Sequence, residues 1–301
     1  MRVAVTGSSG LIGSALVRSL EGDGHGVVRV VRSASAGGDH GATVTWDPVQ
    51  GTVDAAGLEG VDAAVHLAGA GIGDERWSDD RKRVILESRT KGTALLARTL
   101  AGLAAPPAVL LSGSAVGYYG DRGDEVCTET SPAGTGYLAE VCEAWEAAAT
   151  PAVEAGIRTA FLRTGIVQTK AGGALKKTLP LFKLGLGGRF GSGKQWWSWI
   201  SLADEVGAIR HLLDHDVSGP VNLTAPTPVT NAEYTATLGS VLGRPTVLPV
   251  PSFGPKLLLG AEGAKAVLLD GQRAVPSVLE RAGYPFRHPT LEAALRAELS
   301  R

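Results

Sequence analysis

The sequence predicts an α/β fold in which helices cover both faces of a doubly wound parallel sheet. Short apolar runs alternate with stretches of helical periodicity along residues 1–167, as they do in successive βαβ units. The first apolar run leads into a glycine turn and then an apolar helical face, and that order often opens such a sheet. After residue 168 the alternation loosens. We therefore expect a sheet domain over 1–167 and a smaller α+β lobe over 168–301, with some exchange of segments.

The elements follow from local patterns taken in chain order. Helices are expected where apolar residues recur near a period of 3.6, which is after residue 10, over 78–103, over 140–149 and over 204–213. Strands are expected where short apolar or alternating runs occur, which is over 3–5, 27–33, 42–47, 61–70, 107–115, 159–167 and 221–226. Prolines after residue 250 break the C-terminal part into short helical segments.

The composition argues against several classes of protein. A formal net charge of −1 gives no strongly basic surface for nucleic acid or anionic membranes. No apolar run approaches the roughly 20 residues that span a bilayer, and the first strand begins too early to leave room for a signal peptide. Cys127 and Cys142 have no metal-binding spacing, so we expect no metal site. We expect a cytoplasmic protein, monomeric or homodimeric, with a small-molecule substrate.

The stretch VAVTGSSGLIG at residues 3–13 carries the strongest functional signal. A strand, a glycine turn and a helix in this order place backbone N–H groups and a helix N-terminus where a pyrophosphate binds. Gly7 allows the tight turn, Gly10 lets phosphates approach, and Gly13 lets helix and strand pack closely. An ordinary glycine-rich βα turn is the alternative. The residues expected at the cofactor are Thr6, Gly7, Ser9, Gly10, Leu11, Ile12 and Gly13.

The end of the second expected strand indicates which dinucleotide binds. An acidic residue there suits the free 2′-hydroxyl of NAD, whereas an arginine accommodates the 2′-phosphate of NADP. Arg32 stands at this place, followed by Ser33, and no acidic residue lies between Val27 and Ser35. NADP(H) is therefore favoured over NAD, although Arg32 can also be a solvated loop charge. Asp47 either accepts a hydrogen bond from the adenine amino group or begins an Asp-Pro turn.

Several motifs together resemble those of the extended short-chain dehydrogenases/reductases. They are TGSSGLIG at the start, HLAGAG at 66–71, SGSAVGYYG at 112–120, LRTGIV at 162–167 and WISLADEVGAI at 199–209. The chain is similar in particular to the atypical branch called epimerase family proteins, or nucleoside-diphosphate-sugar epimerases. The stretches that indicate this branch are 75–89, 137–146, 184–195 and the segment from about residue 250.

The resemblance implies a Rossmann-type domain that binds a nicotinamide dinucleotide, with a C-terminal lobe over a substrate site. It places Leu67, Ala68 and Gly69 beside the cofactor. Arg163, at the end of its strand, either pairs with another side chain or reaches the ligand. The implied activity is oxidoreduction or epimerisation of a small carbonyl or hydroxyl compound, or of a nucleotide-linked sugar.

The catalytic pattern of the superfamily is incomplete here. That pattern needs a tyrosine, a lysine four residues later and a nearby serine or threonine; the lysine lowers the tyrosine pKa and binds the nicotinamide ribose. Tyr137 stands in the tyrosine position, but Val141 replaces the lysine. Without help the phenol should keep a pKa near or above about 10. The usual spacing before Gly120 gives Ala115, so we take Ser114, one residue earlier, as the hydroxyl partner. The alternative is that Ser114 is a strand-end serine that binds backbone.

Three repairs of this gap remain open. Tyr118 or Tyr119 acts as the acid, Lys194 or Arg189 reaches the site from the second lobe, or water or substrate supplies the proton. A second function is also open, namely a cofactor-binding redox sensor or scaffold with little turnover. The weaker candidates for substrate contact are Glu75, Arg76, Trp77, Tyr118, Arg189, Lys194 and Trp197, of which the last can equally pack the lobe interface.

Overall fold

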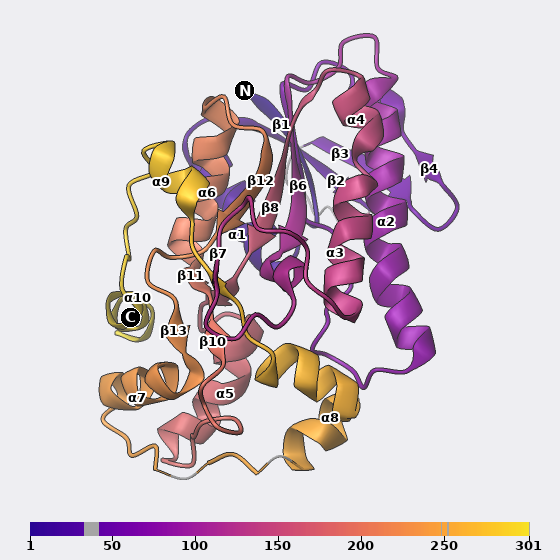
Figure 1. The fold of residues 1–301 in the computed structure, drawn as a ribbon. Helices are drawn as coiled ribbons and strands as arrows, with labels where there is room; N and C mark the ends of the chain where they lie inside the picture. Colours follow the sequence, from indigo (N-terminus) through magenta and orange to yellow (C-terminus); the bar gives the residue numbers. More distant parts are fainter. Residues whose placement is uncertain (33–41, 248, 252, 301) are drawn as a thin grey trace.

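Eight strands form the central sheet of the molecule (Figure 1). The computed structural model describes residues 1–32, 42–247, 249–251 and 253–300. Neighbouring strands are parallel except at one edge, where the last pair is antiparallel. In sheet order the strands are β12 (Gly219–Leu223), β8 (Arg158–Thr164), β6 (Val109–Ala115), β5 (Ala63–His66), β1 (Arg2–Thr6), β2 (Gly26–Val31), β3 (Ala42–Asp47) and β4 (Thr52–Val53).

Helices pack on both faces of this sheet (Figure 1). They are α1 (Leu11–Gly22) and α6 (Leu202–Asp214) on one face, and α2 (Asp79–Ala101), α3 (Tyr137–Ala147) and α4 (Thr150–Glu154) on the other. Successive strand residues point to opposite faces, so Val3 and Val5 join the core under α1 and α6 while Ala4 joins the core under α2 and α4. The predicted doubly wound fold is therefore confirmed.

A smaller lobe lies at the lower end of the view in Figure 1. Its elements are β9 (Ile166–Gln168), α5 (Gly173–Lys183), β10 (Trp196–Trp197), β11 (Trp199–Ser201), β13 (Val229–Thr230), α7 (Asn231–Leu242) and α10 (Leu291–Leu299). Two short two-stranded pairings, β9 with β11 and β10 with β13, connect them. The core of this lobe contains Leu175, Trp197, Trp199, Tyr234 and Leu295.

The C-terminal segment runs back along the sheet domain. It contains α8 (Phe253–Ala264), the π-helical turn η4 (Lys265–Leu269), β14 (Arg273–Ala274) and α9 (Ser277–Arg281). β14 pairs in parallel with β7 (Val126–Cys127). Two further short helical turns within the described residues are η2 (Ala55–Leu58) and η3 (Val116–Tyr119). α8 is tied to the sheet domain because the Trp77 backbone N–H donates to the Leu259 carbonyl (3.0 Å).

One segment crosses from the smaller lobe back to the sheet. α6 packs beside α1, and β12 pairs in parallel with β8 at the sheet edge. The strand expected over 221–226 therefore belongs to the central sheet. A cut after residue 167 would separate β12 and α6 from the sheet on which they pack.

The strand expected over 159–167 is in fact two strands. Gly165 lies so close to the carbonyl oxygen of Ser198 that a Cβ at this position would stand 2.6 Å from it. β8 therefore ends at Thr164, and the chain continues as β9, which pairs with β11 instead of the central sheet. Only a glycine permits this close crossing of the two lobes.

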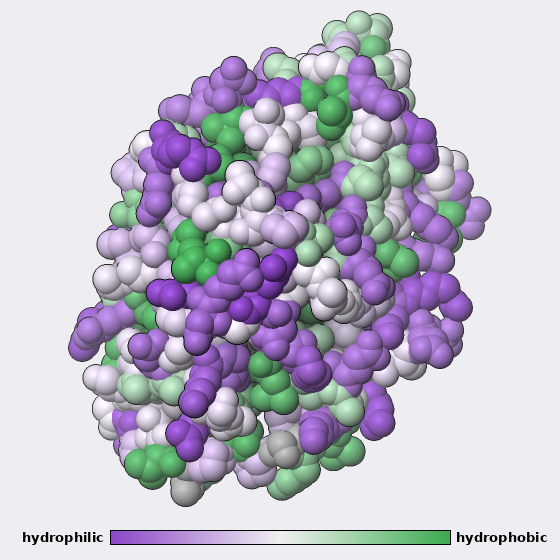
Figure 2. Space-filling view, in the orientation of Figure 1, coloured by the Kyte–Doolittle hydropathy of each residue, from purple (hydrophilic) through white to green (hydrophobic). Residues whose placement is uncertain are grey.

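Hydrophilic and hydrophobic residues are interspersed over most of the face shown in Figure 2. Large apolar side chains are exposed near the lower end, where α5 ends and α8 begins: Leu184 is 73% exposed, and Phe253 and Leu257 are each 74% exposed. Green residues in Figure 2 mark this end of the molecule. Among the helices of the described residues, none has the length and apolar character needed to cross a membrane.

Candidate cofactor and active site

The glycine turn after β1 has the geometry expected of a phosphate-binding loop. Gly7 adopts a φ of 64°, and a Cβ there would stand 2.8 Å from the backbone carbon of Leu67. A Cβ on Gly13 would overlap the carbonyl oxygen of Gly7. Gly10 forms the N-cap of α1 and donates its N–H to Gly7 (2.9 Å). Larger residues at the first and third glycines would therefore force the turn apart.

The first turn of α1 offers its backbone N–H groups to a ligand. No side chain of the described residues caps this helix, and Ser9 and Gly10 are exposed. Leu11 and Ile12 are half-buried, and a Cβ on Gly172 would stand 2.9 Å from the Leu11 side chain. Uncapped N–H groups and the helix dipole together favour an anion at this position.

Thr6 supports the turn from beneath. Its hydroxyl accepts hydrogen bonds from the N–H groups of Leu67 (3.1 Å) and Ala68 (3.2 Å), and it bonds to His66 Nδ1 (2.7 Å). Thr6 and His66 are both buried, and burial lowers the pKa of His66 to about 4. The Thr6 side chain therefore holds together two loops predicted to touch the cofactor, and its hydroxyl is occupied by that contact.

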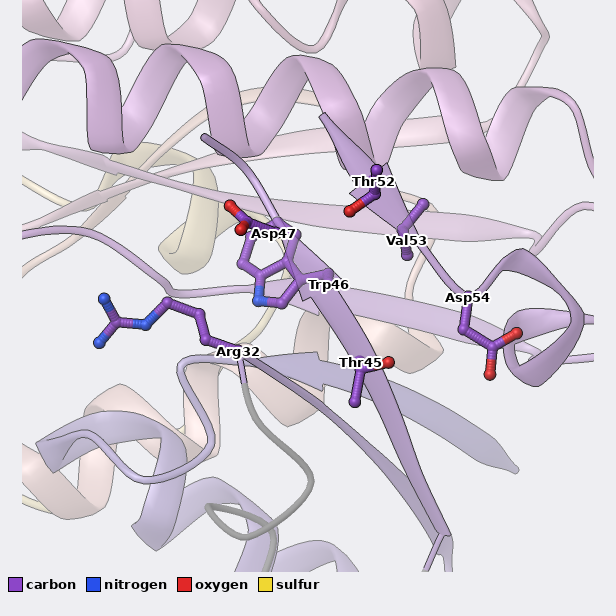
Figure 3. Close-up of a pocket in the computed structure, with 7 residues that line it drawn as sticks. All are labelled: Arg32, Thr45, Trp46, Asp47, Thr52, Val53 and Asp54. Atoms are coloured by element: carbon purple, nitrogen blue, oxygen red, sulfur yellow. The ribbon is translucent and has the colours of Figure 1, made fainter. Parts of the chain in front are cut away.

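Arg32 and Asp47 lie at the carboxyl ends of β2 and β3, beside a hollow of about 360 Å³ (Figure 3). Arg32 is exposed, and within the described residues its guanidinium has no ion-pair or hydrogen-bond partner. Asp47 accepts from the N–H groups of Val49 (2.8 Å) and Gln50 (3.1 Å), so it does begin a turn. Ser33 lies outside the described residues. The end of β2 thus presents a positive charge that no described residue pairs with.

The two catalytic candidates form hydrogen bonds in different places. The Ser114 hydroxyl, at the end of β6, donates to Glu146 Oε1 of α3 (2.6 Å). The Tyr137 hydroxyl, at the start of α3, donates to the carbonyl of Lys82 in α2. Burial raises the pKa of Tyr137, and the nearby Arg89 opposes this rise. The two hydroxyl groups are therefore not bonded to each other.

Arg163 is part of the same buried network as Ser114. Its Nε and Nη2 donate to the two oxygens of Glu146 (2.8 and 2.9 Å), and the side chains of Arg163 and Glu146 are only 3% and 13% exposed. Its Nη1 donates to the Tyr119 hydroxyl (3.1 Å), and its guanidinium stacks on the Tyr118 ring. Of the two roles expected for Arg163, the structure shows side-chain pairing.

The two tyrosines of the GYYG loop belong to this network too. Tyr119 is fully buried and donates its hydroxyl to Asn222 (2.7 Å). Burial raises the pKa of Tyr119 to about 12. Tyr118 is half-buried, with its ring 3.4 Å from the Arg163 guanidinium carbon. Tyr119 is therefore a poor proton donor at neutral pH.

Most of the chain matches one known family. The sequence profile of the NAD dependent epimerase/dehydratase family covers residues 3–224. The chain belongs to this family. A second profile, a domain of unknown function (DUF1731), covers residues 250–298, which contain α8, β14, α9 and α10.

Similar proteins span nearly the whole chain. The epimerase family protein Mb2239 of Mycobacterium bovis is 47% identical over 97% of this chain and 96% of its own length. The crystal structure of human epimerase family protein SDR39U1 with NADPH has a TM-score of 0.91 and 35% identity, covering 100% of both chains. The nucleoside-diphosphate sugar epimerase of Corynebacterium glutamicum has a TM-score of 0.79 and 39% identity, covering 99% of this chain and 58% of that one. The family resemblance is confirmed.

The loop after β5 brings three weaker candidates together in this epimerase-family protein. Trp77 is buried: its indole N–H donates to the Ile72 carbonyl (2.8 Å), and its ring packs against Gly263 of α8. Glu75 is exposed and pairs with Arg81 (3.3 Å). Arg76 is exposed beside Gly260. Trp77 therefore connects the sheet domain to α8 through its contacts with Leu259 and Gly263.

The second-lobe candidates differ in their exposure. Arg189 and Lys194 are exposed on the glycine-rich loop before β10. Trp197 is buried, and its ring centroid lies 4.9 Å from that of Tyr234 in the lobe core. Trp197 thus packs in the core of the smaller lobe, whereas the alternative to substrate stacking placed it at the lobe interface. The described residues contain no cluster of three or more His, Cys, Asp or Glu side chains that could hold a metal ion.

Sequence reasoning missed two acidic residues that the structure makes prominent. Glu146 bonds to both Ser114 and Arg163 and so joins the ends of β6 and β8. Glu205 of α6 is fully buried, with Oε1 accepting from the Thr164 hydroxyl (2.9 Å) and Oε2 unpartnered among the described residues. Both lie on helices, and no local pattern separates them from solvent-facing acids.

Glu205→Gln is expected to change the pH dependence of stability. Burial raises the pKa of Glu205 from 4.5 to about 8 in the folded protein. The folded state therefore binds the proton of the Glu205 carboxyl more tightly than the unfolded state does. This tighter binding stabilises the fold fully below pH 4.5, and the stabilisation is lost as pH rises through about 8. The free energy of unfolding in urea, measured across this range, should fall less steeply for Glu205→Gln than for wild type. Parallel pH profiles would contradict the assignment.

Proposed function

We propose that this protein binds NADP(H), with its diphosphate at the glycine turn and its 2′-phosphate at Arg32. The observation that carries this proposal is the Arg32 guanidinium beside the hollow, which has no partner in the part of the chain that the structure describes. The uncapped N-terminus of α1 and the glycines at which a Cβ would clash fit a diphosphate. The crystal structure of human SDR39U1 with NADPH supports the choice of dinucleotide.

We further propose an oxidoreductase or epimerase that acts on a small carbonyl or hydroxyl compound or on a nucleotide-linked sugar. NADP(H) supplies or accepts the hydride when it is bound. The proposed catalytic residues are Ser114, near the end of β6, and Tyr137, at the start of α3. The part of residues 168–301 that remains outside the sheet is proposed to hold the substrate. The name of the Corynebacterium glutamicum protein supports the nucleotide-sugar alternative.

A second function is a cofactor-binding sensor or scaffold with little turnover. The observation that favours it is the engagement of both candidate hydroxyls: Ser114 donates to Glu146 and Tyr137 donates to a backbone carbonyl. Val141 is buried and can supply neither charge nor hydrogen bond. In this state neither hydroxyl directs its proton toward a substrate.

Hydride transfer separates these two functions. We would first titrate the protein with NADPH and NADH by fluorescence, then follow NADPH oxidation in single turnover with a panel of carbonyl compounds and oxidised nucleotide sugars. An enzyme should bind NADPH and oxidise it with at least one acceptor, and Ser114→Ala should slow that step. Tight binding of NADPH with no oxidation by any member of the panel would support the sensor.

A further inference from the structure

Arg89 occupies an unusual position on α2. Its Nη1 donates to the carbonyls of Ala70 (2.9 Å) and Ile85 (3.1 Å), and its guanidinium carbon lies 4.9 Å from the centre of the Trp145 ring. The residue is half-buried between α2, α3 and the turn after β5. Backbone carbonyls and an aromatic ring therefore hold the guanidinium in place.

The positive charge of Arg89 lacks an acidic partner. Among the described residues, no carboxylate forms an ion pair with it, and its Nε and Nη2 have no acceptor. Burial lowers the pKa of Arg89, which means that its surroundings do not compensate the charge fully. Arginines removed from water are normally paired, so these two donors are available to a ligand.

The location of Arg89 relative to the sheet indicates which ligand atoms it can meet. β2, β1 and β5 are neighbours in that order. Arg32 ends β2 and the glycine turn follows β1, so a dinucleotide laid across this edge would bring its nicotinamide half to β5. A Cβ on Gly69, in the turn after β5, would stand 3.5 Å from the guanidinium carbon of Arg89. The guanidinium of Arg89 therefore lies beside the turn after β5 that was expected at the cofactor.

Other cations near the catalytic candidates are less suitable. Lys82 lies over the Tyr137 ring, 4.7 Å from its centre, but its ammonium is paired with Glu262 of α8 (2.7 Å). Arg189 and Lys194 lie exposed on the second-lobe loop. The positive charge of Arg89 opposes the rise in the pKa of Tyr137 that burial causes. Arg89 on α2 is therefore a better candidate for the missing cation than Arg189 or Lys194 of the second lobe.

We propose that Arg89 takes the place of the absent lysine, binding the nicotinamide ribose hydroxyls through Nε and Nη2 and supplying a positive charge on α2, the helix whose Lys82 carbonyl accepts from Tyr137. This inference rests on the proposed function, because it requires the dinucleotide to lie along the edge formed by β2, β1 and β5. A planar guanidinium with two free donors suits the paired hydroxyls of a ribose. Arg89 is then a cofactor-binding residue contributed by a helix other than the one that carries Tyr137.

Two nucleotide probes test the binding part of this proposal. NADPH contains the nicotinamide ribose, whereas adenosine 2′,5′-bisphosphate contains only the adenosine end. Calorimetry should show that Arg89→Gln weakens the binding of NADPH by about tenfold, as expected for loss of charged hydrogen bonds. The affinity for the bisphosphate should stay within about twofold of the wild-type value. Arg89→Lys keeps the positive charge but loses the planar guanidinium, so its affinity for NADPH should lie between those of wild type and Arg89→Gln.

The controls separate the possible failures. Lys91→Gln removes an exposed charge two residues along α2 and should leave both affinities unchanged. An Arg89→Gln protein that binds both probes equally weakly, or NADPH as tightly as wild type, would overturn the proposal. If the wild-type protein bound neither probe, that result would instead contradict the proposed function. Thermal unfolding of each variant establishes that it is folded before titration.

The charge part of the proposal has a readout that needs no cofactor. Ultraviolet difference spectra report tyrosinate formation on alkaline titration, and the signal of Tyr137 is the part lost in Tyr137→Phe. Removing the positive charge with Arg89→Gln should raise the pKa of the Tyr137 phenol. Arg89→Lys should keep it near the wild-type value. An unchanged titration in Arg89→Gln would contradict an influence of Arg89 on Tyr137.

Discussion

Arg32→Asp is expected to weaken NADPH binding by about 100-fold and NADH binding by less than about threefold, because only NADPH carries the 2′-phosphate. Hydrogen bonds to charged groups contribute roughly 1.5–3 kcal/mol, and the new carboxylate would also repel the phosphate. Arg32 is exposed and unpaired among the described residues, so its replacement should leave the fold intact. Fluorescence or calorimetric titration with the two dinucleotides measures the effect.

Arg18→Asp is the matched control for this prediction. It makes the same change in net charge at an exposed position on the body of α1, away from the hollow that Arg32 lines. NADPH affinity should change little in this variant. Equal losses for NADPH and NADH in Arg32→Asp would contradict a contact between Arg32 and the 2′-phosphate.

Glu146→Ala is expected to lower the free energy of unfolding by about 3–5 kcal/mol, the usual effect of removing one partner of a buried ion pair. The variant leaves Arg163, whose side chain is 3% exposed, without a carboxylate. It also removes the acceptor of the Ser114 hydroxyl. Urea unfolding followed by circular dichroism measures the change.

A double variant shows whether the loss comes from the unpaired charge. Glu146→Ala combined with Arg163→Met removes both charges and keeps an apolar side chain near Tyr118 and Tyr119. Because buried ion pairs can be replaced by apolar residues at little cost, the double variant should be more stable than Glu146→Ala alone. A loss below about 1 kcal/mol for Glu146→Ala, typical of exposed pairs, would contradict a structural role for this pair.

The parts of the fold that depend on local pattern could be predicted from the sequence. Buried parallel strands are recognisable as short apolar runs, so the expected bounds of β1 and β6 are close to those observed. β5 covers only Ala63–His66 of the run expected over 61–70. The glycines at 7, 10 and 13 predicted the turn because each has its own steric reason, which the structure bears out for Gly7 and Gly13. The charge of Arg32 at the end of β2 was likewise visible from spacing.

The parts that depend on distant contacts could not be predicted. Nothing near Gly165 indicates that the Ser198 carbonyl passes beside it and ends β8. Ser114 and its acceptor Glu146 are 32 residues apart. The Thr6 hydroxyl accepts hydrogen bonds from backbone N–H groups 61 and 62 positions away. Arg89 lies on α2 while the gap it is proposed to fill lies on α3. Pairings of this kind become visible only once the helices are packed.

Binding of NADPH to the purified, folded protein tests the central claim most directly. Isothermal titration calorimetry should show one saturable site for NADPH and much weaker binding of NADH. Heats no larger than those of dilution for both dinucleotides, with protein shown to be folded by circular dichroism, would contradict the account.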